Sequence, residues 1–323
     1  MKVLITGATG FLGSHVAERL CDREGVALRL LLRRTSRLEF LDGIDYERVE
    51  GDVRDEDSLR RAVEGVEIVV HVAGLVSALT EARYHEVNAR GTEALVRVAK
   101  AARVKRFVYV SSLAALGPSS DGISPPAAPH PISGYGRSKL AGEQAVLAEK
   151  DTMSVAIVRP PAVYGVRDRA LLPFYRIAKL GFVPVYGDGT RKLSFIHAHD
   201  AADAIIAAAL AEGPSGAVYT ICDGHIHTWR SLIEAYGKAA ERRLRILPVP
   251  PPLFALGGYA GGLAQTIIRR PLPLSPEEIL HMRAPAWLAD NDAITRDLGW
   301  LPRIEIEQGF EQAYRWYRER GWL

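Results

Sequence analysis

Hydrophobic and polar positions follow two different periods through the first half of the chain. Short apolar runs occur at residues 2–6, 27–33, 45–49, 67–72, 105–111 and 153–159, and segments of helical periodicity separate them. In the longest such segment, residues 84–102, Val87, Leu95 and Val98 recur at helical spacing. Strands that alternate with helices predict repeated βαβ units, and therefore a parallel sheet with helices on both faces.

The first predicted strand runs directly into a glycine-rich turn. Gly7, Gly10 and Gly13 are three residues apart, and a helical pattern begins at Phe11. Glycine allows the backbone to turn sharply and approach a ligand, and the free N–H groups of a helix start can hold a pyrophosphate. We therefore expect a dinucleotide here, in contact with Gly7, Thr9, Gly10, Phe11 and Leu12. The spacing departs from the usual G-x-G-x-x-G, so a glycine turn without a ligand is the alternative.

The pattern predicts two domains. We expect an α/β fold with a doubly wound parallel (Rossmann) sheet in residues 1–160 and a smaller, mixed α/β substrate domain in residues 161–323. Segments such as 190–222 are expected to return to the first domain. The ligand crevice should lie beyond the carboxyl ends of the strands, where the strand order reverses. Residues 117–131 contain five prolines and should form an irregular loop at the border of a site.

The composition indicates which binding partners and which cellular compartment to expect. A net charge of +3 gives no reason to expect nucleic acid or a membrane surface, and a small-molecule substrate is expected instead. The apolar stretch 253–268 is too short to span a bilayer, so we expect no integral membrane segment. Part of a buried helix or a lid is favoured there over membrane contact. Cys21 and Cys222 lie in a predicted helix and strand, and no leader pattern precedes the first strand, which favours a reducing cytoplasm.

The end of the second strand bears on the choice of cofactor, because there a dinucleotide enzyme contacts the adenosine ribose. An acidic residue would suit NAD, but this chain has Arg33, Arg34 and Ser36. Guanidinium groups and a hydroxyl match a 2′-phosphate, so NADP is preferred and NAD remains possible. A solvated basic turn is the alternative. After the third strand, Asp52, next to Val53, either contacts the adenine amino group or caps the helix that starts near Asp55.

A tyrosine and a lysine point to the chemistry. Tyr135 and Lys139 are four residues apart at a predicted helix start, so their side chains share one face. An ammonium near a phenol favours the phenolate, which would lower the tyrosine pKa toward the working pH. An exposed helix pair without a catalytic role is the alternative. Ser111 and Ser112, at the end of the fifth strand, are placed where α/β enzymes carry catalytic side chains.

At this point the chain resembles the extended short-chain dehydrogenase/reductase family, in its NAD(P)-dependent epimerase/dehydratase and 3β-hydroxysteroid dehydrogenase branches. The resemblance runs nearly from end to end. It is carried by Gly7-x-x-Gly10-x-x-Gly13, Gly51-Asp52-Val53, His71-Val72-Ala73-Gly74, Asn88-Ala89-Arg90-Gly91-Thr92, Ser111-Ser112, Tyr135-x-x-x-Lys139, Arg159 to Gly165, Phe195 to Ala204, and Asp297 to Pro302.

The resemblance implies a role for each of these residues. Ser112 would orient the substrate carbonyl or alcohol, Tyr135 would exchange the proton, and Lys139 would lower the tyrosine pKa and hold the nicotinamide ribose. Ser112 is chosen over Ser111 because relatives place the active hydroxyl five residues before a glycine, here Gly117. Ser111 would then face the opposite way. His71, Val72, Ala73 and Gly74 would line the cofactor, and further contacts would come from Pro160, Ala162 and Val163. Asn88 would be a structural hydrogen-bonding residue.

Departures from the family pattern indicate the reaction. Sugar dehydratases carry an Asp-Glu pair after the active hydroxyl residue, where this chain has Leu113 and Ala114, which carry no proton. Nucleotide-sugar enzymes hold the diphosphate with an arginine where this chain has Leu193, although Arg191 or Lys192 is a possible substitute. We therefore expect hydride transfer to or from a carbonyl or secondary alcohol of a fairly apolar molecule. A nucleotide-sugar 4-epimerase with retained NAD and a non-catalytic dinucleotide-binding protein are the alternatives.

Two further expectations concern metal and assembly. The segment from His197 to Asp200 resembles a metal cluster in composition, but the family has a structural turn there, so no metal is expected. Family members often pair through two helices, which would make this protein a homodimer through the segments near 85–102 and 135–149.

Overall fold

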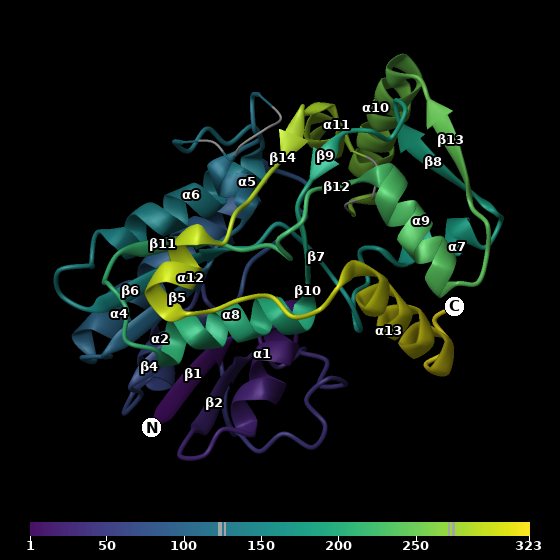
Figure 1. Cartoon of the computed structure of the whole chain (residues 1–323). Coiled ribbons are helices and arrows are strands. Elements are labelled where there is room, and N and C mark those ends of the chain that lie inside the picture. The colour runs from purple at the N-terminus through teal and green to yellow at the C-terminus, as the bar shows by residue number, and fades with distance from the viewer. Residues whose placement is uncertain (122–124, 126, 271, 273–274) are drawn as a thin grey trace.

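The fold is built on a parallel sheet of seven strands. The computed structural model describes residues 1–121, 125, 127–270, 272 and 275–323. Its central sheet has the order β11-β6-β5-β4-β1-β2-β3, and every pairing within it is parallel. The strands are β1 (Lys2–Thr6), β2 (Ala27–Leu32), β3 (Glu47–Glu50), β4 (Ile68–His71), β5 (Arg106–Val110), β6 (Ser154–Arg159) and β11 (Ala217–Thr220). The doubly wound parallel fold predicted from the sequence is confirmed (Figure 1).

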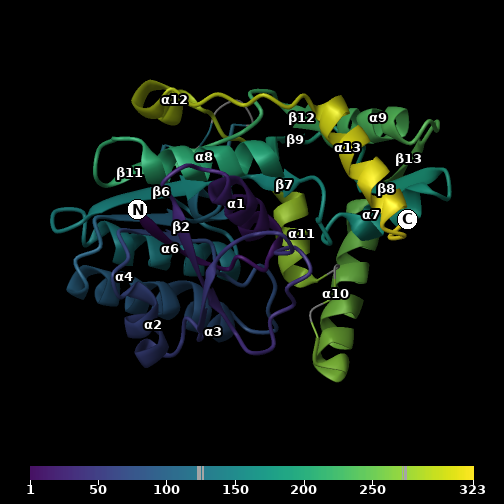
Figure 2. The ribbon, with the colours of Figure 1, turned by 90° about the horizontal axis from the view of Figure 1, so that it is seen from below.

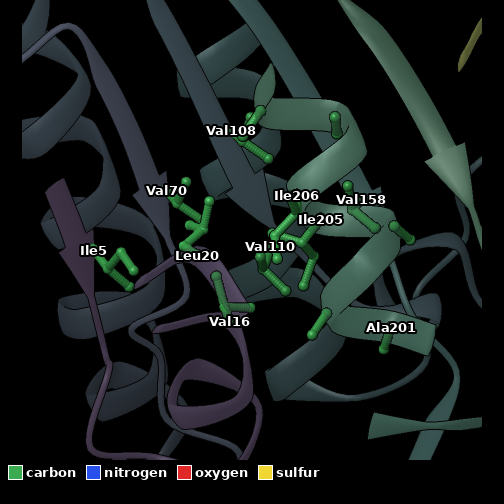
Figure 3. Packing of buried hydrophobic residues seen from close by; sticks show 14 of the residues in the cluster. Ile5, Val16, Leu20, Val70, Val108, Val110, Val158, Ala201, Ile205 and Ile206 are labelled. Carbon is green, nitrogen blue, oxygen red and sulfur yellow. The ribbon is translucent and has the colours of Figure 1, made fainter. Parts of the chain in front are cut away.

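Helices cover both faces of this sheet, because successive strand residues point to opposite sides. On one face, Ile5, Val70, Val108 and Val158 pack against α1 (Phe11–Cys21) and α8 (Ala198–Leu210), as Figure 3 shows. On the other face, the neighbouring strand residues pack against α2 (Glu56–Val63), α4 (Gly91–Ala101) and α6 (Gly134–Leu147). The strand order reverses between β1 and β4, so the predicted ligand site lies at the carboxyl ends of these two strands.

The long helix predicted over residues 84–102 contains an irregularity. The helical run consists of α3 (Glu81–Tyr84), the π-helix η1 (His85–Arg90) and α4. Asn88 lies within the π segment, where its amide donates to the Leu75 carbonyl at 2.9 Å and to Ser138 Oγ at 3.0 Å. Its Oδ1 accepts from the Leu75 N–H at 2.7 Å. The hydrogen-bonding role expected for Asn88 is confirmed, and it joins the helix to the loop after β4.

The rest of the chain forms small sheets and helices beside the carboxyl ends of the strands. The short strands are β7 (Ala162–Tyr164) with β10 (Phe195–His197), β8 (Phe182–Tyr186) with β13 (Arg245–Val249), and β9 (Lys192–Leu193) with β12 (His227–Thr228) and β14 (Ala286–Trp287). Around them lie α5 (Leu113–Leu116), α7 (Leu172–Ala178), α9 (Trp229–Ala239), α10 (Pro251–Ile268), α11 (Pro276–Arg283) and α13 (Ile306–Glu319), whereas α12 (Asp292–Leu298) packs on the central sheet beside β11 and α8. The division at residue 160 stays a prediction.

Aromatic side chains form the core of this second part. Tyr175 stacks on Tyr236 with ring centroids 4.7 Å apart, and Phe310 and Tyr317 of α13 pack against them. Tyr317 is fully buried and donates to the Asp168 carbonyl at 2.7 Å. The last helix is therefore fastened to the body by its aromatic residues, as its sequence predicted.

The apolar stretch 253–268 is a helix, but it is not buried. It belongs to α10, of which Gly258 alone is classed as buried. The expectation of a buried helix was wrong because α10 packs one narrow face on α11 and leaves the other side chains outside. Among the described residues, no helix combines the length and the apolar character needed to cross a membrane.

Candidate active site

The glycine turn leaves a helix start open to a ligand. Gly7 has a φ of +78°, and a Cβ added there would lie 2.6 Å from the Ala73 nitrogen. A Cβ on Gly13 would lie 2.1 Å from the Gly7 carbonyl oxygen, so the turn requires both glycines. Gly10 caps α1 without a side-chain hydrogen bond, and no acidic residue stands in the first turn. The residues present therefore fit an anionic pyrophosphate at the N–H groups of Phe11 and Leu12.

The adenosine end of the predicted cofactor site is basic. Arg33 and Arg34 are exposed at the end of β2, and the turn is closed by the Ser36 N–H, which donates to the Arg33 carbonyl at 3.0 Å. Ser36 Oγ accepts from the Arg33 N–H at 3.1 Å. The turn therefore carries two exposed arginines and a serine hydroxyl, which are the residue types expected to bind a 2′-phosphate.

Asp52 does not cap the helix that follows it. The N-cap of α2 is Asp55, whose side chain accepts from the Asp57 N–H. Asp52 instead accepts from Arg54 Nε at 2.8 Å and from the Arg54 N–H, and the pKa of its carboxyl is lowered mainly by this guanidinium. Of its two expected roles, capping is wrong, and the contact to adenine stays a prediction. Its neighbour Val53 is buried and lies against Gly91.

The loop after β4 reaches the lysine of α6. Ala73 N–H donates to Thr6 Oγ1 at 3.3 Å, and the Val72 N–H donates to the Thr6 carbonyl at 3.1 Å. Gly74 is exposed, and a Cβ there would lie 3.3 Å from Lys139 Nζ. A side chain at position 74 would therefore press on this lysine. The backbone at Gly74 leaves the way to Lys139 open from the crevice.

The buried side chain of His71, at the end of β4, supports the loop that follows this strand. Its Nδ1 is 2.6 Å from Thr6 Oγ1 and its Nε2 is 2.9 Å from Thr92 Oγ1, within a fully buried environment. Burial, together with a smaller effect of the Lys139 charge, lowers the pKa of His71 to about 3. The imidazole is therefore neutral at ordinary pH and serves as a link between β1, β4 and α4.

The two serines at the end of β5 face different ways, as expected. Ser111 Oγ donates to Glu143, whose carboxylate is bound in two places by Arg159, at 2.8 Å and 2.6 Å. Ser112 caps α5, where its Oγ accepts from the Ala114 N–H at 3.2 Å. The Ser112 side chain also hydrogen-bonds the Tyr135 phenol. Ser111 therefore belongs to a buried ion pair, and Ser112 belongs to the site.

Tyr135 lies at the start of α6, which Ser133 caps by accepting from the Gly136 N–H at 3.1 Å. Burial raises the pKa of the phenol, and the hydrogen bond from Ser112 opposes that rise. The expectation that Lys139 lowers this pKa toward the working pH was wrong for this structure, because desolvation of the phenolate is the largest effect. The phenol is therefore protonated at neutral pH.

Lys139 is buried one turn further along the same helix. Its Nζ donates to the Val110 carbonyl at 2.7 Å and lies 4.6 Å from the centre of the Tyr109 ring. Burial lowers the pKa of Lys139 to about 7, and the charge of Glu143 opposes that change. The amine is thus held at the end of β5, between Ser112 and Gly74, and it changes charge near neutral pH.

Two residues of the site carried no signal in the sequence. Glu277 of α11 accepts from the Tyr135 N–H at 2.9 Å, although the two are 142 positions apart. The Tyr84 ring lies 5.8 Å from the Tyr135 ring, and burial together with the nearby Glu277 raises the pKa of Tyr84. Neither residue belongs to a local motif. Glu277 enters the site because α11 lies across the start of α6, and Tyr84 enters it because α3 packs against α6.

The remaining predicted contacts lie on the loop after β6. The Pro160 carbonyl accepts from the Leu113 N–H at 2.8 Å, Ala162 is exposed, and Val163 is half-buried in β7. They border the Ser112 turn, but their contact to a cofactor stays a prediction.

The Arg191 side chain binds backbone carbonyls and not the position expected for a diphosphate. Its Nη1 donates to the carbonyl oxygens of Arg283 and Ala284 at 2.6 Å and 2.5 Å, so it holds the end of α11. It is not positioned as a spare partner for a diphosphate.

The histidine cluster has structural partners. His197 caps α8 by accepting from the His199 N–H at 3.3 Å, and Asp200 accepts from the N–H groups of Arg303 and Ile304. His227 lies 2.6 Å from Asp223. Across the part of the chain that the structure describes, no three His, Cys, Asp or Glu side chains are grouped to hold a metal ion.

Comparison with known proteins places this architecture among dinucleotide enzymes. The sequence model of the NAD dependent epimerase/dehydratase family matches residues 3–222. The chain is 31% identical to a ceramide reductase of Caulobacter vibrioides, across 99% of this chain and 96% of that protein. It is also 31% identical to sterol demethylase protein B of Methylococcus capsulatus, across the full length of both. The crystal structure of gox2253 superposes with a TM-score of 0.81 at 27% identity, over 99% of each chain.

Proposed function

Because the chain belongs to the NAD dependent epimerase/dehydratase family of extended short-chain dehydrogenases/reductases, we propose that it reduces a carbonyl group on an apolar small molecule, or oxidises the matching alcohol. The observation that carries this proposal is the arrangement of three side chains. The Ser112 hydroxyl lies close enough to the Tyr135 phenol to lower its pKa, and Lys139 lies one turn away with its amine beside Gly74.

Each of these residues has a definite task in a reduction. A nicotinamide cofactor held at the glycine turn of Gly7, Gly10 and Gly13 would supply the hydride for the carbonyl carbon. The Ser112 hydroxyl donates to the carbonyl oxygen and so fixes its position beside Tyr135. Since burial keeps the Tyr135 phenol protonated, that phenol can deliver its proton to the oxygen as the alcohol forms. The Val110 carbonyl keeps the Lys139 amine in place beside Gly74, where it would hold the nicotinamide ribose. In the oxidative direction, each proton transfer runs in reverse.

The surroundings of the site favour an apolar substrate over a nucleotide sugar. Leu113 and Ala114 follow the active hydroxyl and are buried, so no acid–base pair is present for dehydration. Leu193 is a buried residue of β9, and Arg191 is occupied by backbone carbonyls. Several relatives are named for lipid substrates, among them the ceramide reductase and the sterol demethylase protein B. We therefore propose a substrate with a long apolar portion and no diphosphate.

For the cofactor we propose NADP over NAD. The support is the exposed pair Arg33 and Arg34 beside the Ser36 hydroxyl at the end of β2. A 2′-phosphate would receive charge-assisted hydrogen bonds from this turn, whereas the free hydroxyl of NAD would meet two cations with no acceptor.

A substrate screen tests the proposal. The purified protein is incubated with NADPH or NADH and with long-chain ketones, sterol ketones or UDP-sugars, while absorbance of the reduced nicotinamide is followed. We expect oxidation of NADPH with an apolar ketone, and none in the Tyr135→Phe variant. An epimerase would instead interconvert UDP-sugars with tightly held NAD and no net change in absorbance. Failure of every substrate class, with cofactor bound, would favour a non-catalytic protein.

We also propose a homodimer that pairs α4 and α6 with their copies. These two helices pack side by side on one face of the sheet, with Lys100 of α4 bonded to Glu149 just after α6. Size-exclusion chromatography with light scattering measures the mass of the protein in solution. A monomer at micromolar concentration would contradict the proposal.

A further inference from the structure

Helix α10 carries a row of large apolar side chains that face solvent. Leu253, Leu256, Tyr259, Leu263 and Ile267 recur at intervals of three and four, so they share one helical face, named here the apolar stripe. Their exposed fractions are 58%, 66%, 74%, 66% and 74%. A continuous apolar surface of this kind marks a contact with a partner or a membrane, because isolated exposed residues would not align.

The opposite face of α10 is joined to the reaction centre. A Cβ on Gly258 would lie 2.4 Å from Ile279, and one on Gly262 would lie 3.0 Å from Pro276, so small residues let α10 pack closely on α11. Helix α11 in turn holds the Tyr135 N–H through Glu277. Figure 2 shows α10 reaching out beyond the body of the molecule with α11 between it and the sheet. The apolar stripe on α10 is thus connected to Tyr135 of α6 through α11.

Charge distinguishes a membrane surface from other partners. Residues 246–268 contain no Asp, Glu, Lys or Arg, and Arg269 and Arg270 follow directly and are exposed. The stripe therefore offers no charge to orient a folded protein partner, while the arginine pair at its end matches anionic headgroups. With 18 residues, α10 is about 27 Å long, and an apolar helix of this kind with basic residues at its end suits the plane of a lipid interface.

We propose that α10 docks flat on a bilayer containing anionic lipid. The apolar stripe enters the boundary between headgroups and acyl chains, and Arg269 and Arg270 contact lipid phosphates. The site beneath α11 then receives its apolar substrate from the membrane. This last step rests on the proposed function, but the docking itself depends only on α10.

Vesicle sedimentation with the full chain tests the docking. We expect the protein to sediment with vesicles of equimolar phosphatidylcholine and phosphatidylglycerol, and less with phosphatidylcholine alone. The double variant Leu256→Glu/Leu263→Glu should bind at least about tenfold more weakly. Arg269→Gln/Arg270→Gln should lose the preference for anionic vesicles. The control is Leu301→Glu, which adds one negative charge at a residue 60% exposed outside α10 and should bind normally.

Two other results would overturn the proposal. If the wild type leaves the vesicles in the supernatant, or if Leu301→Glu reduces sedimentation as much as the double variant, α10 does not dock on lipid. If light scattering finds that Leu256→Glu/Leu263→Glu halves the mass while vesicles have no effect, the stripe binds a second copy. NADPH oxidation with a short, water-soluble ketone is measured in parallel. Its absence in the wild type as well as in every variant would refute the proposed function and leave the docking result standing, whereas normal turnover without sedimentation would refute the docking alone.

Discussion

The Lys139 amine donates to the Val110 carbonyl over 2.7 Å and so fastens the catalytic helix α6 to the end of β5. This bond holds the amine at the end of β5, and Gly74, after β4, lies beside it. It also explains why a buried cation is tolerated, because the strand end supplies an acceptor where solvent is excluded.

Removal of the Lys139 amine should lower turnover without lowering the stability of the folded protein. Burial lowers the pKa of Lys139 to about 7, below its value in the unfolded chain. The cost of burying the ammonium is therefore full below about pH 7 and fades as pH rises from 7 toward the unfolded value. At pH 6.5, Lys139→Met should keep a urea midpoint at or above that of the wild type but lose turnover by about a hundredfold or more.

The matched control for that variant is Lys105→Met, which removes an exposed lysine that pairs with Glu67. It should leave turnover unchanged. Equal turnover in Lys139→Met and the wild type would contradict the role given to the amine.

The Tyr135 phenol should be essential for turnover and dispensable for cofactor binding. Tyr135→Phe removes the proton donor but keeps the ring that packs on Tyr84, so kcat should fall by about 10²–10⁴-fold. NADPH affinity, measured by fluorescence, should change little. Tyr314→Phe on α13 is the comparison variant and should behave as the wild type. A kcat for Tyr135→Phe within a few-fold of the wild type would remove Tyr135 from the mechanism.

The arginine pair after β2 should decide cofactor preference. In Arg33→Gln/Arg34→Gln, the KM for NADPH should rise about 10–100-fold, because two charge-assisted contacts to the 2′-phosphate are lost. The KM for NADH should stay within a few-fold. Arg37→Gln changes a further exposed arginine of the same turn and serves as the control. Equal losses for both cofactors would mean that the turn does not distinguish them.

The buried ion pair that contacts Ser111 should contribute strongly to the stability of the folded protein. Glu143 and Arg159 have side chains 1% and 10% exposed, so Glu143→Gln leaves a buried guanidinium without its counter-charge. The free energy of unfolding should fall by about 3–5 kcal/mol in urea denaturation. Glu81→Gln breaks the pair that Glu81 forms with Arg137. The two side chains are 47% and 45% exposed, so this change should lower the free energy of unfolding by no more than about 1 kcal/mol. Similar losses in both variants would show that burial does not set the difference.

Acid should destabilise the protein through its buried histidines. Burial lowers the pKa of His71 and His197 to about 3 and that of His199 to about 4. The unfolded chain takes up these protons near pH 6.5, so stability should fall as pH drops from about 6.5 to about 4. Each histidine contributes at most about 1.4 kcal/mol per pH unit in this window.

Urea midpoints measured between pH 7.5 and 4.5 check this slope. His199→Gln should flatten it, whereas His225→Gln, at an exposed position, should not. An unchanged slope in His199→Gln would assign the acid sensitivity to other groups.

The sequence by itself determined the parts of this protein that depend on local spacing. The alternation of apolar runs predicted six strands of the sheet, the glycines predicted the turn before α1, and the interval of four placed Tyr135 and Lys139 on one helical face. Such features depend on neighbours along the chain, so they can be derived without knowing what packs against them.

The tertiary structure alone decided how distant segments meet. It brought Glu277 to Tyr135, turned Arg191 toward the end of α11, and left the apolar side chains of α10 outside. It also set the direction of the Tyr135 pKa, because desolvation depends on what surrounds the phenol and not on the lysine four residues away. Burial is a property of the packed molecule, and no local pattern in the chain specifies it.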